Sequence, residues 1–184
     1  MSELQEGWCS GTSHLNNVGI VQNNKRYINY DDKIIIGISD INSDEYDTLI
    51  FAQRDAKTVQ IPQFIKVVSS FSFANSIIES VFVPASVNYI GECAFHSCKK
   101  LLKVEIHPDS KIQSFEANTF YYSGIESFFF PSQISKISFC AFFNSRNLHS
   151  ICFSQESKLQ EIGPNSFNNT SIVSLCIPPK VTDI

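Results

Sequence analysis

One pattern of apolar residues recurs from residue 58 to residue 184, and it constrains the fold more than any other feature of this chain. Its clearest copy, VFVPASVNYIGECAFHSCKKL, runs from Val81 to Leu101. Each copy begins with two apolar residues separated by one residue, which is the alternation of a half-buried β-strand. The second residue of each pair is Ile61, Val83, Ile106, Phe130, Phe153 and Ile177, and the first is Val59, Val81, Val104, Phe128, Ile151 and Leu175.

Four more columns of equivalent residues follow in the copies. A third is Ile65, Val87, Ile112, Ile134, Leu159 and Val181, and a fourth, three residues later, is Val68, Ile90, Phe115, Ile137, Ile162 and Ile184. Phenylalanine then recurs at Phe73, Phe95, Phe120, Phe142 and Phe167, and a small polar residue at Ser76, Cys98, Ser123, Ser145 and Thr170. A copy of 22 to 24 residues cannot bury such a face alone, so we expect a solenoid whose equivalent columns touch about 4.8 Å apart. The small polar side chains are expected to hydrogen-bond to backbone groups of the turn.

The copies also alternate in length. After Val83 and Phe130 the chain reaches the third column in four residues, whereas after Ile106 and Phe153 it takes six. Val83, Phe130 and Ile177 are therefore each 47 residues apart. This spacing indicates growth by duplication of a two-turn block.

The residues before the array predict a cap, which repeat proteins need because their first repeat has an exposed apolar face. Residues 1–26 lack periodicity and are expected to be a mobile terminus, from which Trp8 could dock onto the core. Residues 27–57 are expected to form the cap, with a hairpin turning at Asp31 and Asp32 and a third strand at 48–51. Residues 58–184 then form an array of about five and a half repeats that stops mid-repeat at Ile184.

Charge and hydropathy exclude some classes of function. The formal net charge is −4, and no cluster of Lys and Arg is present, which argues against nucleic-acid binding. No apolar run approaches the roughly 20 residues of a membrane-spanning helix, and the first residues lack the features of a secretory signal. We therefore expect no membrane insertion within this chain.

The stretch from Val81 to Leu101, with its pattern VxVPxxVxxIGxxAFxxCxxL, resembles the repeat of BspA-like leucine-rich repeat proteins, which occur among bacterial and protozoan surface antigens. The resemblance covers residues 58–184, although Phe replaces Leu or Ile at several strand positions and Ser or Thr replaces Cys98 in four turns. It implies an α/β to mainly β, right-handed leucine-rich-repeat solenoid, with a parallel sheet on one face and turns or short helical segments on the other. It also implies an adhesin-like surface protein that binds a host or matrix protein.

The outward positions of the predicted strands are the candidate partner-binding face, because such solenoids bind partners on exposed faces. The residue between the two strand anchors is Gln60, Phe82, Glu105, Phe129, Cys152 and Cys176, and the column before it includes Lys103. Phe82 and Phe129 are expected to face solvent as aromatic anchors, although single exposed Phe residues are also common on protein surfaces. Lys103 and Glu105 would make a polar break between them.

Cys152 and Cys176 share the outward column of neighbouring strands, close enough for a disulfide. Strand neighbours in parallel register often have poor dihedral angles for a bridge, so free thiols are the favoured alternative. The segment from Cys93 to Cys98 contains residue types that bind zinc. It lacks a second pair of ligands, however, so no metal or cofactor is expected. The four histidines sit in different columns without nucleophile and acid partners, so no enzymatic activity is expected.

Two functional hypotheses follow. The first is a non-enzymatic module at the cell surface that recognises a protein partner through the exposed sheet face. The second is an intracellular leucine-rich-repeat scaffold that uses the same face in the cytoplasm, and the missing signal sequence and the cysteines that look unpaired favour it.

Overall fold

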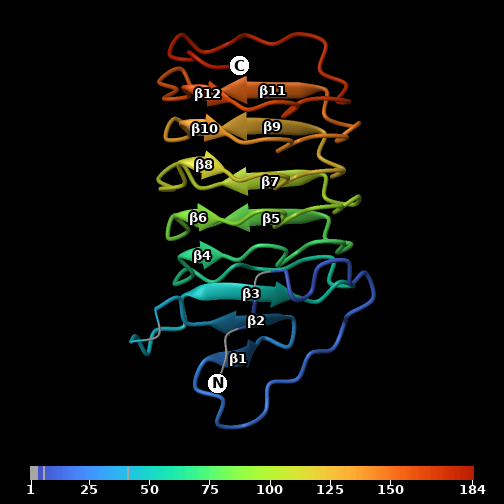
Figure 1. The fold of residues 1–184 in the computed structure, drawn as a ribbon, viewed down its shortest axis with the longest axis vertical. Coiled ribbons are helices and arrows are strands. Elements are labelled where there is room, and N and C mark those ends of the chain that lie inside the picture. The colour runs from blue at the N-terminus through green and yellow to red at the C-terminus, as the bar shows by residue number, and fades with distance from the viewer. Residues whose placement is uncertain (1–3, 6, 41) are drawn as a thin grey trace.

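Strands of successive repeats lie one above another along a single axis, with the N-terminal strands at one end of the stack (Figure 1). The computed structural model describes residues 4–5, 7–40 and 42–184. None of these residues is helical, so the fold is a mainly β solenoid and the segments opposite the strands are turns.

The cap consists of β1 (Tyr27–Tyr30), β2 (Ile34–Gly37) and β3 (Thr48–Ala52). β1 and β2 form an antiparallel hairpin, as predicted, and β3 is antiparallel to β2. The hairpin turns without glycine because Asp31 and Asp32 both adopt left-handed φ angles of 47° and 57°, a conformation that Asp tolerates better than most residues. β3 then pairs in parallel with β4 (Val67–Val68), which joins the cap to the array.

The first row of the array holds four-residue strands: β5 (Ser80–Val83), β7 (Lys103–Ile106), β9 (Ser127–Phe130) and β11 (Ser150–Phe153). Their side chains alternate as predicted. In β5, Val81 and Val83 are buried, whereas Ser80 and Phe82 are exposed. The row is made of two parallel pairs, β5 with β7 and β9 with β11, instead of one continuous sheet. The ladder therefore breaks after the second strand of each pair.

The second row holds two-residue strands: β4, β6 (Tyr89–Ile90), β8 (Ser114–Phe115), β10 (Lys136–Ile137) and β12 (Glu161–Ile162). They pair in parallel: β4 with β6, β8 with β10, and β10 with β12. The second residue of each strand is the fourth column of the repeat, and in all five strands it is buried. This short ladder thus fixes one wall of the core.

The turns between the two rows form a third ladder. In the turn around Phe95, the amides of Cys93, Phe95 and Ser97 donate to carbonyl groups of the next turn, at 3.0, 2.9 and 2.7 Å. The alternate amides, such as those of Ala94 and His96, donate to the carbonyl three residues earlier in the same turn. Each turn therefore satisfies its own backbone and also binds its neighbour.

This alternation requires two left-handed residues in every turn. They occupy two columns with φ between 55° and 62°, which are Phe71, Cys93, Asn118, Cys140 and Asn165, and Asn75, Ser97, Tyr122, Asn144 and Asn169. Asn is the non-glycine residue that most readily takes this conformation, and it fills half of these ten positions.

The Phe column forms a continuous stack through the core. Phe73, Phe95, Phe120 and Phe142 are fully buried, and successive ring centroids lie 4.8, 5.4 and 5.0 Å apart. Phe167 continues the stack 5.6 Å from Phe142 and is partly buried. Equivalent side chains therefore touch between turns, as the repeat predicted.

The small polar column lies beside this stack and bonds to it. The Cys98 thiol donates to the carbonyl oxygen of Phe73 at 3.0 Å, and the Ser145 hydroxyl donates to that of Phe120 at 2.8 Å. Cys98 and Ser145 therefore each give a carbonyl group of the preceding turn a second donor, as predicted, whereas the Thr170 hydroxyl donates to Phe167 of its own turn.

The segment before β1 contacts the cap in the part that the structure describes. The Cys9 side chain is buried with Tyr27, Ile35 and Phe51, and the Trp8 ring lies 5.7 Å from the Phe51 ring. Trp8 thus docks onto the cap, whereas residues 1–3 and 6 of the predicted mobile terminus lie outside the described residues. The domain boundaries at residues 26 and 57 stay predictions.

Candidate functional site

The outward side of the four-residue strands carries most of the candidate site residues. Phe82 lies on β5, Lys103 and Glu105 on β7, Phe129 on β9 and Cys152 on β11, and all five are exposed. The Phe82 and Phe129 side chains have exposed fractions of 44% and 57%. We call this surface, formed by the outward residues of β5, β7, β9 and β11, the strand face.

Register on the strand face brings some of these residues together. Phe82 lies directly opposite Glu105, and Phe129 lies directly opposite Cys152. The ladder break between β7 and β9 separates the first pair from the second. The strand face therefore presents two aromatic side chains that are each held within a paired block.

Polar contacts surround Phe82. Lys103 and Glu105 form an ion pair along β7, and the His107 ring meets the Phe82 ring edge-on with centroids 6.3 Å apart. Both members of the ion pair are more than half exposed, so the pair adds at most about 1 kcal/mol to stability. The polar break predicted beside the aromatic residues is thus present.

Cys152 and Cys176 are exposed and not joined in a disulfide, and both line a groove of about 390 Å³. Cys176 lies in a segment that forms no strand, unlike its equivalents Phe82, Glu105, Phe129 and Cys152 in the four preceding turns. Leu175 and Ile177, whose equivalents Phe128 and Phe130 are 3% and 1% exposed, are themselves 38% and 43% exposed.

The turns that follow the Phe column carry a row of stacked aromatic rings that the sequence pattern did not predict. The rings of His96 and Tyr121 stack 4.8 Å apart and nearly parallel, and Tyr121 stacks on Phe143 at 5.2 Å. Burial lowers the pKa of His96 below its usual value. The three residues share a column of the repeat, because they directly follow Phe95, Phe120 and Phe142, but their differing residue types hid this column.

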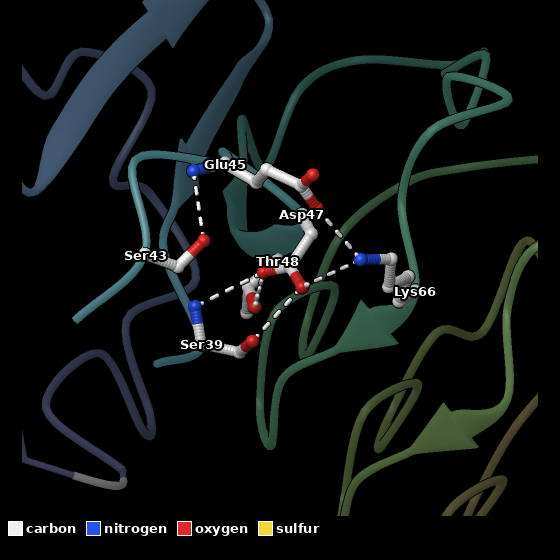
Figure 2. A network of polar contacts seen from close by, with 6 residues as sticks. All are labelled: Ser39, Ser43, Glu45, Asp47, Thr48 and Lys66. Carbon is white, nitrogen blue, oxygen red and sulfur yellow. Dashed lines mark hydrogen bonds and ion pairs between the residues drawn. The ribbon is translucent and has the colours of Figure 1, made fainter. Parts of the chain in front are cut away.

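A polar network joins the cap to the first turn of the array (Figure 2). Asp47 accepts hydrogen bonds from the Ser39 amide and hydroxyl at 3.0 and 2.9 Å and from the Thr48 hydroxyl at 3.1 Å. Lys66 lies 2.9 Å from Glu45 and 3.7 Å from Asp47. Burial acts to raise the pKa of Asp47, but these hydrogen bonds and the Lys66 charge outweigh it and hold the pKa below its usual value.

A groove of about 590 Å³ opens beside this network. Its lining includes Tyr46, Phe64, Lys66, Asn88 and Lys111, so it mixes aromatic, amide and cationic groups. The ring of Phe64 packs edge-on against Tyr30 of the cap, 5.7 Å away. No sequence motif pointed to this groove, because it is formed by segments of the cap and of three successive turns.

Arg54 is fully buried where the terminus, cap and array meet. Its guanidinium group donates to the carbonyl oxygens of Ser72 and Phe71 at 2.7 and 3.2 Å, and to the Cys9 sulfur at 3.2 Å. The same group lies 4.5 Å from the Phe51 ring centroid. Burial lowers the pKa of Arg54 and raises that of Cys9. Arg54 therefore acts as a structural link between the three parts.

The zinc interpretation finds no support in the geometry of Cys98, whose buried thiol bonds to a backbone carbonyl instead. Across residues 4–5, 7–40 and 42–184, no group of three or more His, Cys, Asp or Glu side chains is placed to hold a metal ion. The described chain also has no helix with the length and hydropathy to span a membrane.

Comparison with known proteins identifies the repeat. The family described as "BspA type leucine rich repeat region" matches residues 66–184 in six copies. No curated protein sequence matches the chain.

Three solved structures of bacterial proteins share the fold. The pneumococcal vaccine antigen PcpA has a TM-score of 0.72 at 20% identity over 86% of this chain and 46% of its own. A leucine-rich repeat protein from Bacteroides ovatus has a TM-score of 0.63 at 21% identity over 68% of this chain and 32% of its own. A leucine-rich cell surface protein from Faecalibacterium prausnitzii has a TM-score of 0.52 at 16% identity over 91% of this chain and 51% of its own. This chain thus spans a third to a half of their lengths.

Proposed function

The chain belongs to the BspA-type leucine-rich repeat family, and from this premise we propose that it is a non-enzymatic module that binds a protein partner through its strand face. Repeat solenoids use their extended exposed surfaces for this purpose. Phe82 and Phe129 would be the anchors of the interface, with Lys103, Glu105, Cys152 and Cys176 around them.

The observation that carries the proposal is the exposure of Phe82 and Phe129 on an otherwise polar row. Their neighbours in the column before, Ser80 and Ser127, are small and exposed, so neither ring is covered by an adjacent side chain of that column. Aromatic side chains that become buried at an interface commonly supply much of its binding energy. Exposed Phe at two equivalent strand positions is therefore better suited to a partner than to solvent.

The spacing of the two rings sets the size of the partner surface. β5 and β9 are two turns apart, which corresponds to roughly 10 Å along the axis at the usual strand spacing. The ion pair of Lys103 and Glu105 lies between them. The partner would therefore need two apolar contacts roughly 10 Å apart with polar groups between them.

Site-specific photo-crosslinking tests the proposal. A photoreactive phenylalanine analogue is placed at Phe82, at Phe129 or at Phe139, which is a matched control because it is 50% exposed but lies in a turn. The proposal expects one and the same protein adduct from positions 82 and 129 and none from position 139. Adducts from all three positions alike, or from position 139 alone, would contradict it.

The proposal also places the module at the cell surface. One structural neighbour is described as a vaccine antigen and another as a cell surface protein, and both share this fold. Labelling of intact cells with a membrane-impermeant amine reagent should modify exposed lysines such as Lys99 and Lys103. Labelling only after lysis would reject the surface location and favour the intracellular scaffold.

The non-enzymatic part of the proposal is supported by the contacts of the histidines. His96 stacks on Tyr121, His107 packs against Phe82, and the His149 ring contacts the carbonyl oxygen of Asn147. Ser13 and His14 are in contact at 2.9 Å on an exposed loop, where a substrate would not be shielded from water. None of these arrangements resembles a nucleophile oriented by a base and an acid.

A further inference from the structure

Two exposed thiols line the groove beside β11. Cys152 comes from β11, and Cys176 comes from the following turn. Phe153, Ser174 and Pro178 complete this part of the lining. The remaining cysteines are buried, so these are the two thiols of the described chain that solvent reaches freely.

The segment that carries Cys176 is hydrogen-bonded to the preceding turn at its two ends but not in its middle. The Ser171 amide donates to Leu148 and the Thr182 amide donates to Gln160, each at 2.9 Å. Between these anchors, residues 172–180 form no strand and no hydrogen bond to β11 among the described residues. Strand pairing is also interrupted between β7 and β9. Both interruptions come after a strand, β7 or β11, from which the chain takes six residues to reach the third column of the repeat.

Loose packing accompanies the missing ladder. Leu175 and Ile177 are 38% and 43% exposed, whereas their equivalents in the preceding turn, Ile151 and Phe153, are partly buried against the core. The segment can therefore move toward β11 without breaking any backbone hydrogen bond of the ladder.

We propose that Cys152 and Cys176 form a thiol–disulfide pair that closes this groove when it is oxidised. The two residues occupy equivalent positions one turn apart and line the same groove, and a bond requires their Cα atoms to lie about 4.4–6.8 Å apart. Rigid parallel strands would resist the dihedral angles of a bridge. The 172–180 segment is not held in such a ladder, so that obstacle does not apply here.

The chemistry is an exchange with a small-molecule disulfide such as oxidised glutathione. One cysteine thiolate attacks the external disulfide, forms a mixed disulfide and releases one glutathione thiolate. The second cysteine thiolate attacks the mixed disulfide, forms the Cys152–Cys176 bond and releases the second glutathione. Two protein thiols are oxidised, one external disulfide is reduced to two thiols, and the protein protons pass to the released thiolates or to solvent. This pairing does not depend on the proposed partner binding.

Peptide mapping tests the bond directly. The folded protein is incubated with oxidised glutathione, the remaining thiols are blocked with iodoacetamide, and the product is digested with trypsin without reduction. Cleavage after Arg146, Lys158 and Lys180 places Cys152 in peptide 147–158 and Cys176 in peptide 159–180. The expected product is these two peptides joined, with a mass two hydrogens below their sum. In Cys152→Ser the joined peptide should vanish, and Cys176 should carry one glutathione instead.

Two results of the peptide mapping would overturn the proposed pairing. One is wild-type protein with glutathione on both cysteines and no joined peptide, which would mean that the thiols cannot reach each other. The other is a joined peptide found only in covalent dimers, which would make the bond intermolecular. Amide hydrogen exchange then tests closure: oxidation should slow exchange in residues 172–180 of the wild type but not in Cys152→Ser, and unchanged exchange in a fully oxidised wild type would refute closure.

Discussion

The ring of Phe95 stacks on the ring of Phe120 with centroids 5.4 Å apart and planes 10° from parallel, although 25 residues separate them in the chain. Phe95 also stacks on Phe73 of the preceding turn, at 4.8 Å. Each ring in the column therefore supports two neighbours. The column is the part of the core on which adjacent turns depend most directly.

Substitution of Phe95 by Ala should lower the free energy of unfolding by about 3–5 kcal/mol, because it removes a fully buried ring and leaves a cavity between two others. Urea unfolding followed by circular dichroism measures the change. Phe139→Ala is the control, since that ring is half exposed, and it should cost well under half as much. Equal losses in the two variants would contradict the assignment of the Phe column to the core.

Substitution of Ser145 by Ala should lower the free energy of unfolding by about 0.5–1.5 kcal/mol, because it removes the hydroxyl's hydrogen bond to the Phe120 carbonyl, which keeps the Ser123 amide as its other donor. It also removes the contact with the Ser123 hydroxyl at 3.0 Å. Ser145→Cys should cost less, since Cys98 makes the equivalent bond to Phe73. A Cys variant less stable than the Ala variant would show that size, and not hydrogen bonding, governs this column.

Substitution of Ser97 by Asn should raise the free energy of unfolding by up to about 1 kcal/mol, because Asn is several-fold enriched in left-handed conformations. Ser97 has φ of 58°, and Asn75, Asn144 and Asn169 already occupy its equivalents. Ser97→Val should lower stability, since a β-branched residue is a poor fit there. Unfolding curves of the three proteins should rank Asn above Ser above Val, and any other order would contradict the turn geometry.

Substitution of Asp47 by Asn should lower the free energy of unfolding by about 1–3 kcal/mol at neutral pH, because the Ser39 and Thr48 donors lose a charged acceptor. The pKa of Asp47 is lower in the folded state, so its stabilisation is full above its usual pKa and disappears as the pH falls through the folded value. The difference between wild type and variant should therefore shrink below about pH 4.

Urea unfolding between neutral and acidic pH measures this dependence, with the exposed Asp109→Asn as the control. A difference between Asp47→Asn and wild type that stays constant across that range would contradict the network shown in Figure 2.

The sequence alone predicted which columns of the repeat are buried, because the equivalents of Val81, Val83 and Phe95 recur at regular spacing. All three residues are buried in the structure. The role of Cys98 followed from its column for the same reason. The strand face could be assigned from the alternation alone, and Phe82 is exposed accordingly.

Features that depend on contacts between unlike segments could not be predicted. Arg54 lies in a turn next to Asp55, yet it is buried because Cys9 and Thr12 of a segment without periodicity contact it. The left-handed columns were hidden as well, because Cys93 stands where Asn118 stands in the next turn. The ladder breaks follow the six-residue connections after β7 and β11, but the sequence alone does not show that a longer connection interrupts strand pairing.

The most direct test of the central claim is the dissociation constant of the partner captured at positions 82 and 129, measured with wild type, with Phe82→Ser/Phe129→Ser and with Phe139→Ser. Both strand-face rings are exposed, so the double variant should remain folded, with stability within about 0.5 kcal/mol per substitution. We expect the dissociation constant of the double variant to be at least tenfold higher, a loss of about 1.4 kcal/mol in binding free energy, and that of Phe139→Ser to equal the wild-type value. Unchanged affinity in the folded double variant, or an equal loss in Phe139→Ser, would contradict recognition through the strand face.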